Sequence, residues 1–146
     1  MSELKKRVPA VEGWFTMDAE APALLGSRCK SCGTYFFPKE SFFCKNPNCT
    51  GAEFDEVPLS PVGKLWSFTN NCYAAPAPFF APDPFVPYAI AAVELAEERM
   101  VVLGQMAEGT EVSNLKVGME VELVLEKLYE DDASEYMVWR WKPVAA

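Results

Sequence analysis

Four cysteines with paired spacing offer the clearest chemistry in this chain of 146 residues. Two residues separate Cys29 from Cys32, and four separate Cys44 from Cys49. Each spacing fits a tight turn that directs two thiolates at one point, and two such turns complete a tetrahedral zinc shell. A shell closed by four protein sulfurs leaves no position for a substrate, so we expect a structural metal. Iron and plain buried cysteines are the alternatives.

The other residue types offer little catalytic chemistry, because the chain has no histidine. Cys72 is the remaining cysteine, and a thiolate nucleophile normally needs a base or a cation beside it. We therefore expect Cys72 to be a small residue at a strand end. The carboxylates stand mostly in polar runs that favour solvated turns, and no glycine-rich phosphate loop occurs. The sequence thus predicts no catalytic residue.

Charge is unevenly distributed along the chain. Residues 1–46 hold seven basic and five acidic residues, whereas residues 47–146 hold six and sixteen. Because phosphate neutralisation dominates nucleic-acid binding, the acidic part is a poor surface for such a ligand. Any anionic ligand is expected to meet the basic front of the chain. Its relevant cations are Arg28, Lys30, Lys39 and Lys45.

Composition and sequence signals also limit the cellular compartments in which we expect the protein. No apolar run approaches the roughly 18 residues of a membrane span. Basic residues near the N-terminus are not followed by the apolar segment of a secretory signal. Five cysteines in a chain without such a signal favour reduced thiols. We predict a cytoplasmic protein that contacts neither membrane nor nucleic acid.

The cysteines must be positioned by elements in the front third of the chain. We expect a helical segment within residues 1–27, with Gly26 at its end. Residues 28–54 are predicted to form a zinc ribbon, since strand-prone aromatics between the cysteine pairs favour a small hairpin. Residues 55–62 contain two prolines and are predicted to be a linker. The apolar anchors expected in the helical segment are Trp14, Phe15, Leu24 and Leu25.

Residues 63–146 show the pattern of a β domain. Turns separate five candidate strands, of which the last two alternate with period 2 and the second is mostly apolar. Five strands suit a small Greek-key barrel such as the OB-fold. A plain five-stranded sheet is the alternative. The overall prediction is a mainly β protein with an N-terminal helical segment. The candidate strands are Lys64–Thr69, Tyr88–Leu95, Met100–Met106, Val121–Glu126 and Tyr136–Trp141.

The segment 72–87 between the first two candidate strands is unusual. It holds five prolines and four aromatic residues but a single charge, so it is neither a strand nor typical of disorder. Phe79, Phe80 and Phe85 are apolar anchors of the kind that fill pockets on a protein partner. The alternative is that they fold back as a lid over the barrel.

Several motifs in this order resemble one known family. They are Leu25-x2-Arg28-Cys29-x2-Cys32-Gly33, Phe37-Pro38, Gly63–Thr69, Pro87–Leu95 and Val117–Val121. The chain resembles small proteins with a rubredoxin-like zinc ribbon and a C-terminal OB-fold, once described as a domain of unknown function and often called acyl-CoA-associated OB-fold proteins. The match covers nearly the whole chain. The C-x4-C spacing and the long aromatic segment depart from the common pattern.

This resemblance implies a role in an enzyme complex. Members accompany the archaeal acetoacetyl-CoA thiolase, the aldolases that shorten steroid side chains, and the thiolase that cleaves 2-benzoylsuccinyl-CoA in anaerobic toluene degradation. The thiolase-fold partner carries the catalytic residues, and the small subunit docks on it and shapes the acyl-CoA entrance. The resemblance thus implies a non-catalytic zinc-binding subunit, paired with its partner in a heterotetramer of two plus two.

Further expectations concern the ligand of such a complex. The basic front is expected near the phosphates of coenzyme A, because Arg and Lys pair well with phosphate. The bulk of the aromatic segment favours an aromatic acyl group such as benzoylsuccinyl. Three alternative functions are an aldolase partner, a free-standing acyl-CoA-binding protein and a binder of single-stranded nucleic acid.

Overall fold

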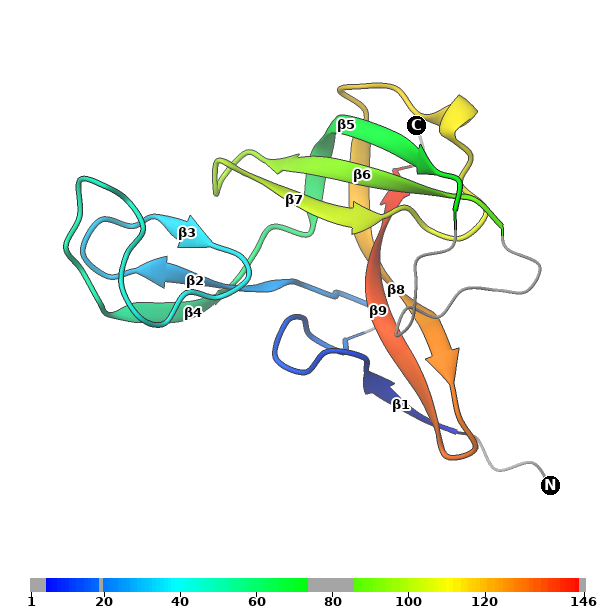
Figure 1. Ribbon diagram of the computed structural model, residues 1–146, viewed down its shortest axis with the longest axis horizontal. Helices are drawn as coiled ribbons and strands as arrows, with labels where there is room; N and C mark the ends of the chain where they lie inside the picture. Colours follow the sequence, from blue (N-terminus) through cyan, green and yellow to red (C-terminus); the bar gives the residue numbers. More distant parts are fainter. Residues whose placement is uncertain (1–4, 19, 74–85, 145–146) are drawn as a thin grey trace.

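The computed structural model describes residues 5–18, 20–73 and 86–144. Within these residues the backbone forms one sheet of six strands and one of three. Figure 1 shows the smaller sheet as a lobe that projects from the side of the larger one. The two parts correspond to the predicted ribbon and the predicted β domain.

The smaller sheet contains the first cysteine pair and has three strands in the order β3-β2-β4. Residues 55–58, predicted to be a linker, belong to β4, so that prediction is wrong for them. Their backbone pairs antiparallel with β2. Pro58 is compatible with β4 because β4 lies at the sheet edge, where a missing N–H costs no ladder hydrogen bond. The strands are β2 (Leu25–Cys29), β3 (Tyr35–Phe36) and β4 (Phe54–Pro58).

The larger sheet has the order β1-β9-β8-β5-β6-β7. It curls so that β7 and β9 meet through a parallel bridge between Met106 and Trp141. Strands β5 to β9 therefore form a partly open barrel with OB-type connectivity, and a plain sheet is excluded. All five predicted strands are confirmed. They are β5 (Val62–Asn71), β6 (Tyr88–Leu95), β7 (Met100–Gln105), β8 (Glu120–Glu130) and β9 (Ser134–Pro143); a short 3-10 helix, η1 (Val112–Asn114), precedes β8.

The predicted N-terminal helix is wrong, because the described part of residues 1–27 contains no α-helix. Strand β1 (Lys6–Pro9) instead pairs in parallel with β9. Phe15 and Leu24 face each other in an antiparallel bridge. The backbones of the apolar residues that suggested a helix thus pair with each other across a loop. Gly13, with a φ of 82°, and the prolines at 9 and 22 break any helical run.

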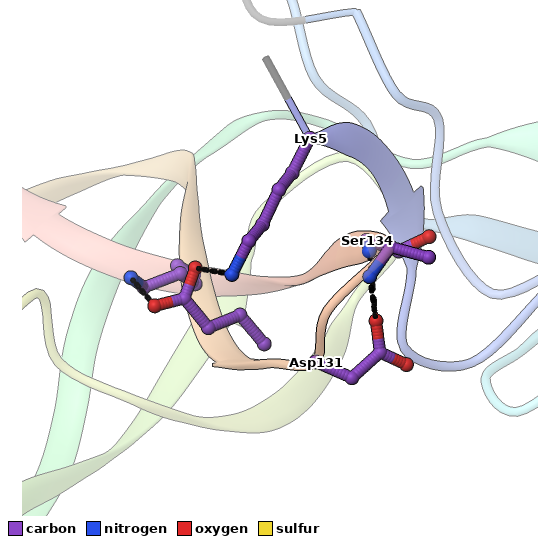
Figure 2. Close-up of polar contacts among 6 residues, drawn as sticks. Lys5, Asp131 and Ser134 are labelled. Carbon is purple, nitrogen blue, oxygen red and sulfur yellow. Dashed lines mark hydrogen bonds and ion pairs between the residues drawn. The ribbon is translucent and has the colours of Figure 1, made fainter. Parts of the chain in front are cut away.

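Polar contacts at the β8–β9 turn surround the start of β1, as Figure 2 shows. Lys5 Nζ lies 3.1 Å from a carboxylate oxygen of Glu130, an exposed pair of small energetic value. Asp131 Oδ1 accepts hydrogen bonds from the backbone N–H groups of Ser134 and Ala133, at 2.7 and 2.9 Å. The Asp131 carboxylate therefore fixes the turn between β8 and β9, beside which β1 is placed.

The apolar core is continuous from the ribbon junction into the barrel. Buried Leu24 and Leu59 belong to the same cluster as Leu65 and Val93 of the barrel. Three aromatic rings complete the junction. Trp139 stacks on Trp14 with 6.0 Å between centroids, and Phe37 of the ribbon meets both rings edge-on, at 5.6 Å from Trp14 and 5.8 Å from Trp139. This packing holds the ribbon lobe on the barrel.

A buried carboxylate fastens the connection between the two sheets. Glu98, in the β6–β7 turn, is 8% exposed. Its Oε1 accepts hydrogen bonds from the Ser60 backbone N–H at 2.9 Å and from the Ser60 hydroxyl at 2.8 Å. Ser60 lies between β4 and β5, so one side chain ties the interdomain connection to the barrel.

We predict that Glu98→Ala lowers the free energy of unfolding by about 1–3 kcal/mol, because the partly buried N–H and hydroxyl of Ser60 would both lose their acceptor. Urea denaturation measures this change. Glu97→Ala is the matched control, since Glu97 is exposed and its one contact with Ser60 is a long hydrogen bond of 3.4 Å from the hydroxyl. It should change the free energy of unfolding by less than about 0.5 kcal/mol. Equal effects from both substitutions would contradict the assignment.

Candidate functional site: a four-cysteine metal centre

The first cysteine pair stands in a tight turn at the end of β2. The Gly33 N–H donates to the Cys29 carbonyl at 2.9 Å, and the Cys29 N–H donates to the Thr34 carbonyl at 2.9 Å. Gly33 has a φ of 79°, which a residue with a side chain rarely adopts. The glycine therefore allows the chain to reverse directly after Cys32, which turns both thiols to one side.

The second pair stands in a wider turn. The Cys44 N–H donates to the Gly51 carbonyl at 2.8 Å, and the Cys49 N–H donates to the Asn46 carbonyl at 3.0 Å. The Asn46 side chain accepts from the Asn48 N–H at 3.0 Å, an Asx turn that organises the added residues. These hydrogen bonds explain how a C-x4-C spacing still brings two thiols together.

The four thiols converge on one point. All four Sγ atoms lie within 4.8 Å of one another. Cys29 Sγ is 3.8 Å from Cys49 Sγ, and Cys32 Sγ is 3.6 Å from Cys44 Sγ. Zinc–sulfur bonds of about 2.3 Å in a tetrahedron require sulfur separations of about 3.8 Å. The donor set and its spacing therefore fit a closed tetrathiolate zinc site, and no disulfide joins these cysteines.

Polar groups around Cys32 favour its thiolate. The Thr34 hydroxyl lies 3.1 Å from Cys32 Sγ, and the Asn46 side-chain amide donates to the same sulfur at 3.7 Å. The hydroxyl and the backbone of Thr34 lower the pKa of Cys32 to about 6. Sequence reasoning missed Thr34 and Asn46, although a hydroxyl two residues after a ligand cysteine is a usable signal for a donor to sulfur.

Cys44 differs from Cys32 in its surroundings. It is 5% exposed, and burial raises the pKa of its thiol to about 12 in the metal-free protein. A bound cation must therefore displace this proton, which makes metal binding and proton release one equilibrium. Cys32 is thus already a thiolate at neutral pH, whereas Cys44 becomes one only when the metal binds.

The basic residues predicted to meet an anionic ligand are already engaged by the protein. Lys30, Lys39 and Lys45 lie 3.7, 2.6 and 3.1 Å from the carboxylates of Asp55, Glu56 and Glu40. Arg28 lies over the Tyr35 ring, with 5.3 Å from its guanidinium carbon to the centroid. Phosphate contact by these residues stays a prediction, and it would have to compete with these ion pairs.

The other predicted contacts cannot be placed so directly. Phe79, Phe80 and Phe85 lie outside the described residues. Cys72 is exposed, and its Sγ donates to the Asn70 carbonyl at 3.6 Å. Across the described ranges, no helix is long and apolar enough to cross a membrane.

A cleft that sequence reasoning did not locate opens in the barrel. It has a volume of about 490 Å³ and lies between the start of β6, the segment after β7 and the second half of β8. Arg140 lines it and donates through Nη1 to Glu126 Oε1 at 3.0 Å. The cleft exists because β8 pairs with β5 only over Val62–Lys64, so the barrel stays open beyond that point.

We expect one zinc ion per chain, measured by elemental analysis of the purified protein. Cys44→Ser should abolish zinc retention, because hydroxyls are poor ligands for this metal and three thiolates leave the shell incomplete. Cys72→Ser is the matched control and should retain one zinc ion. Iron in the wild-type protein, or full zinc retention in Cys44→Ser, would contradict the site.

The pKa of Cys32 generates a second prediction. Zinc affinity should fall more steeply once pH falls below about 6, because protons then compete for Cys32 as well as for Cys44. Thr34→Val removes the hydroxyl that stabilises the thiolate, so zinc release should begin at a higher pH and affinity should drop by about 10-fold. A chromophoric chelator titrated across pH measures both effects. Thr50→Val, at an exposed ribbon position, should leave the profile unchanged.

Comparison with known proteins gives the same two-part division. Residues 18–55 match the family described as the ChsH2 rubredoxin-like zinc ribbon domain, and residues 56–126 match the ChsH2 C-terminal OB-fold domain. The fold resembles the solved structure of the Ltp2-ChsH2(DUF35) aldolase, with a TM-score of 0.62 and 24% sequence identity over 83% of this chain and 84% of that one.

Curated relatives extend the likeness over most of the sequence. A DUF35 domain-containing scaffold protein of Methanocaldococcus jannaschii is 34% identical over 84% of this chain and 82% of its own length. The benzoylsuccinyl-CoA thiolase subunit BbsA of Geobacter metallireducens is 35% identical over 88% of this chain and 80% of its own length. BbsA of Thauera aromatica is 54% identical over 37% of this chain and 35% of its own length.

The four clustered thiols fit a structural zinc module, and the two family models match the ribbon and the barrel of this chain in succession. The chain therefore belongs to the DUF35 family, whose members join a ChsH2-type rubredoxin-like zinc ribbon to a C-terminal OB-fold.

Proposed function

We propose that this protein is a zinc-binding scaffold subunit that docks on a thiolase-type catalytic subunit acting on acyl-CoA thioesters. The observation that carries the proposal is the Geobacter relative, a thiolase subunit that aligns with 88% of this chain and therefore with both of its parts. The archaeal scaffold protein aligns over a similar share. The proposed reaction, carbon–carbon cleavage with coenzyme A, takes place on the partner.

The geometry of the metal centre supports a non-catalytic role. Its four sulfurs complete the coordination of a zinc ion, so no position remains for water or substrate. The sequence also contains no histidine, the side chain used most often for general acid–base work. The zinc would stabilise a docking module, and the partner would supply the nucleophile and the base.

We further propose that the barrel cleft forms one wall of the acyl-CoA entrance. Its volume of about 490 Å³ is in the range of small-molecule sites, and Met106, Ala107 and Leu128 give it apolar lining. An aromatic acyl group such as 2-benzoylsuccinyl is the specific candidate, because two relatives are named for that thiolase. The C-terminal end of the proline-rich segment, Val86 and Pro87, lines this cleft.

An aldolase is the second candidate for the partner, because this chain shares its fold with the Ltp2-ChsH2(DUF35) aldolase. Both candidates require the same scaffold role and differ in the reaction of the partner. A binder of single-stranded nucleic acid is disfavoured by charge, since residues 47–146 carry sixteen acidic and six basic residues.

Co-expression tests the proposal. We expect the chain to co-purify with the thiolase-fold protein encoded beside its gene, and light scattering to give a defined heteromer, two plus two on our expectation. The pair should cleave 2-benzoylsuccinyl-CoA in the presence of coenzyme A, whereas neither subunit alone should do so. Cleavage of an aldol substrate instead would identify the aldolase alternative.

Two results would contradict this function. One is robust thiolytic activity of the isolated chain; the other is the lack of any stable complex with a thiolase-fold protein. Cys72→Ser serves as the control for a hidden nucleophile and should leave the activity of the complex unchanged within about twofold. A loss of several orders of magnitude, typical when a nucleophile is removed, would place catalysis in this chain.

A further inference from the structure

The metal centre is open to solvent at one of its four sulfurs. Cys32 is exposed, whereas Cys29 and Cys44 are buried and Cys49 is intermediate. A pocket of about 410 Å³ beside this sulfur is lined by residues 28–33 and by Asp55. A small molecule can therefore reach Cys32 directly, while the other three thiols are more sheltered.

The groups around this pocket favour the loss of an anion close to Cys32. The Arg28 guanidinium lies over the turn, with Nε 3.4 Å from the Gly33 carbonyl oxygen. Lys30 and Asp55 pair with each other at 3.7 Å, so Arg28 leaves the pocket with a net positive charge. A cation at this place stabilises a hydroxide ion that departs from the Cys32 sulfur.

Each thiol of the centre has a second thiol close enough to form a disulfide with it. Cys32 Sγ lies 3.6 Å from Cys44 Sγ, and Cys29 Sγ lies 3.8 Å from Cys49 Sγ. A disulfide bond is about 2.05 Å long, so each sulfur would have to move by less than about 1 Å. Both pairs join one turn to the other, across 12 and 20 positions of the chain.

Cys72 provides an internal comparison, because it is also exposed but stands outside the four-thiol cluster. Its Sγ donates to the Asn70 carbonyl at 3.6 Å. An oxidised Cys72 would therefore lack a neighbouring thiol of the cluster to complete a disulfide. Exposure alone does not distinguish Cys32 from Cys72; the adjacent Cys44 thiol does.

We propose that the four-cysteine centre is a redox switch, which hydrogen peroxide operates by converting the zinc ligands into two disulfides. The Cys32 thiolate attacks one peroxide oxygen, the O–O bond breaks and hydroxide leaves, so Cys32 becomes a sulfenic acid. The Cys44 thiolate then attacks the Cys32 sulfur, which forms the disulfide and expels the second oxygen as hydroxide. Two protons from solvent convert both hydroxide ions to water.

The same two steps at Cys29 and Cys49 consume a second peroxide. No thiolate then remains to hold the zinc ion, because the thiolate is the form of cysteine that binds metals. In total, the four ligand thiolates lose four electrons, and two peroxides and four protons become four waters. This inference goes beyond the proposed function and does not depend on it.

Oxidation of the ribbon would also reach the barrel. Phe37 lies within the chain segment that a Cys32–Cys44 bond would close, and its ring meets Trp14 and Trp139 edge-on. When the four sulfurs no longer share one centre, the ribbon loses the interaction that orders it. The aromatic packing at the junction is then expected to loosen.

Peroxide treatment of the zinc-loaded full chain tests the switch. About two molar equivalents of hydrogen peroxide should release one zinc ion per chain, measured with a chromophoric chelator. After an acid quench and alkylation, peptide mass spectrometry should find Cys32 joined to Cys44 and Cys29 joined to Cys49. Dithiothreitol followed by zinc should restore the metal content. Cys72→Ser is the matched control and should release zinc at the wild-type rate within about twofold.

Two further measurements examine the entry point. Dimedone present at less than one equivalent of peroxide should trap a sulfenic acid at Cys32 and not at Cys44. Arg28→Gln should retain one zinc ion yet slow its release by about fivefold, because the leaving hydroxide loses its cation. Lys39→Gln removes a ribbon lysine that pairs with Glu56 and should leave the rate unchanged within about twofold.

Several results would overturn this inference. One is retention of zinc when Cys72 is fully oxidised; another is a disulfide within one turn, between Cys29 and Cys32. Equal slowing by Arg28→Gln and Lys39→Gln would remove the assigned entry point. Unchanged near-ultraviolet circular dichroism after zinc release would show that the junction does not respond. Because these measurements use the chain without a partner, absence of a thiolase-fold partner would contradict the proposed function alone.

Discussion

The convergence of four thiols on one cation is the interaction on which the ribbon depends. Its three strands contain five, two and five residues, too few to build an apolar core. The hydrogen bonds of the two turns direct the thiols, but only a metal can neutralise four thiolates held within 4.8 Å of one another. Cys44 makes this dependence clear, because its buried thiol would otherwise keep its proton.

The effect of the metal extends beyond the ribbon, because the lobe is fastened to the barrel at two places. Phe37 follows β3 and packs edge-on against both Trp14 and Trp139. Ser60 follows β4 and is held by the buried carboxylate of Glu98. A ribbon that loses its metal would release both attachments. This coupling is what a rigid scaffold requires, since a docking surface binds tightly only when its parts are ordered before binding.

The distribution of charge and apolar surface agrees with the division of labour that we propose. The ribbon neutralises its own lysines with nearby carboxylates, so it presents little unpaired positive charge. The barrel carries the excess of acidic residues, which disfavours a phosphate ligand on its outer surface. Its open cleft offers a place for a small molecule.

The sequence by itself determined the features that depend on local spacing. The two cysteine pairs predicted the metal site because each turn is formed by residues close in the chain. The five barrel strands were predictable because the last two alternate with period 2 and the others are short strand-prone runs bounded by turns. The family resemblance supplied the order of the two parts, which the comparisons confirm.

Only the tertiary structure decided the features that depend on distant backbone partners. Trp14 and Leu25 suggested a helix, but their backbones hydrogen-bond each other across a loop. Residues 55–58 suggested a linker until their pairing with β2 was known. The exposure of Trp66 depends on a bulge that is defined by the register against β6. The physical reason is common to all three: local sequence cannot specify a pairing whose partner lies elsewhere in the chain.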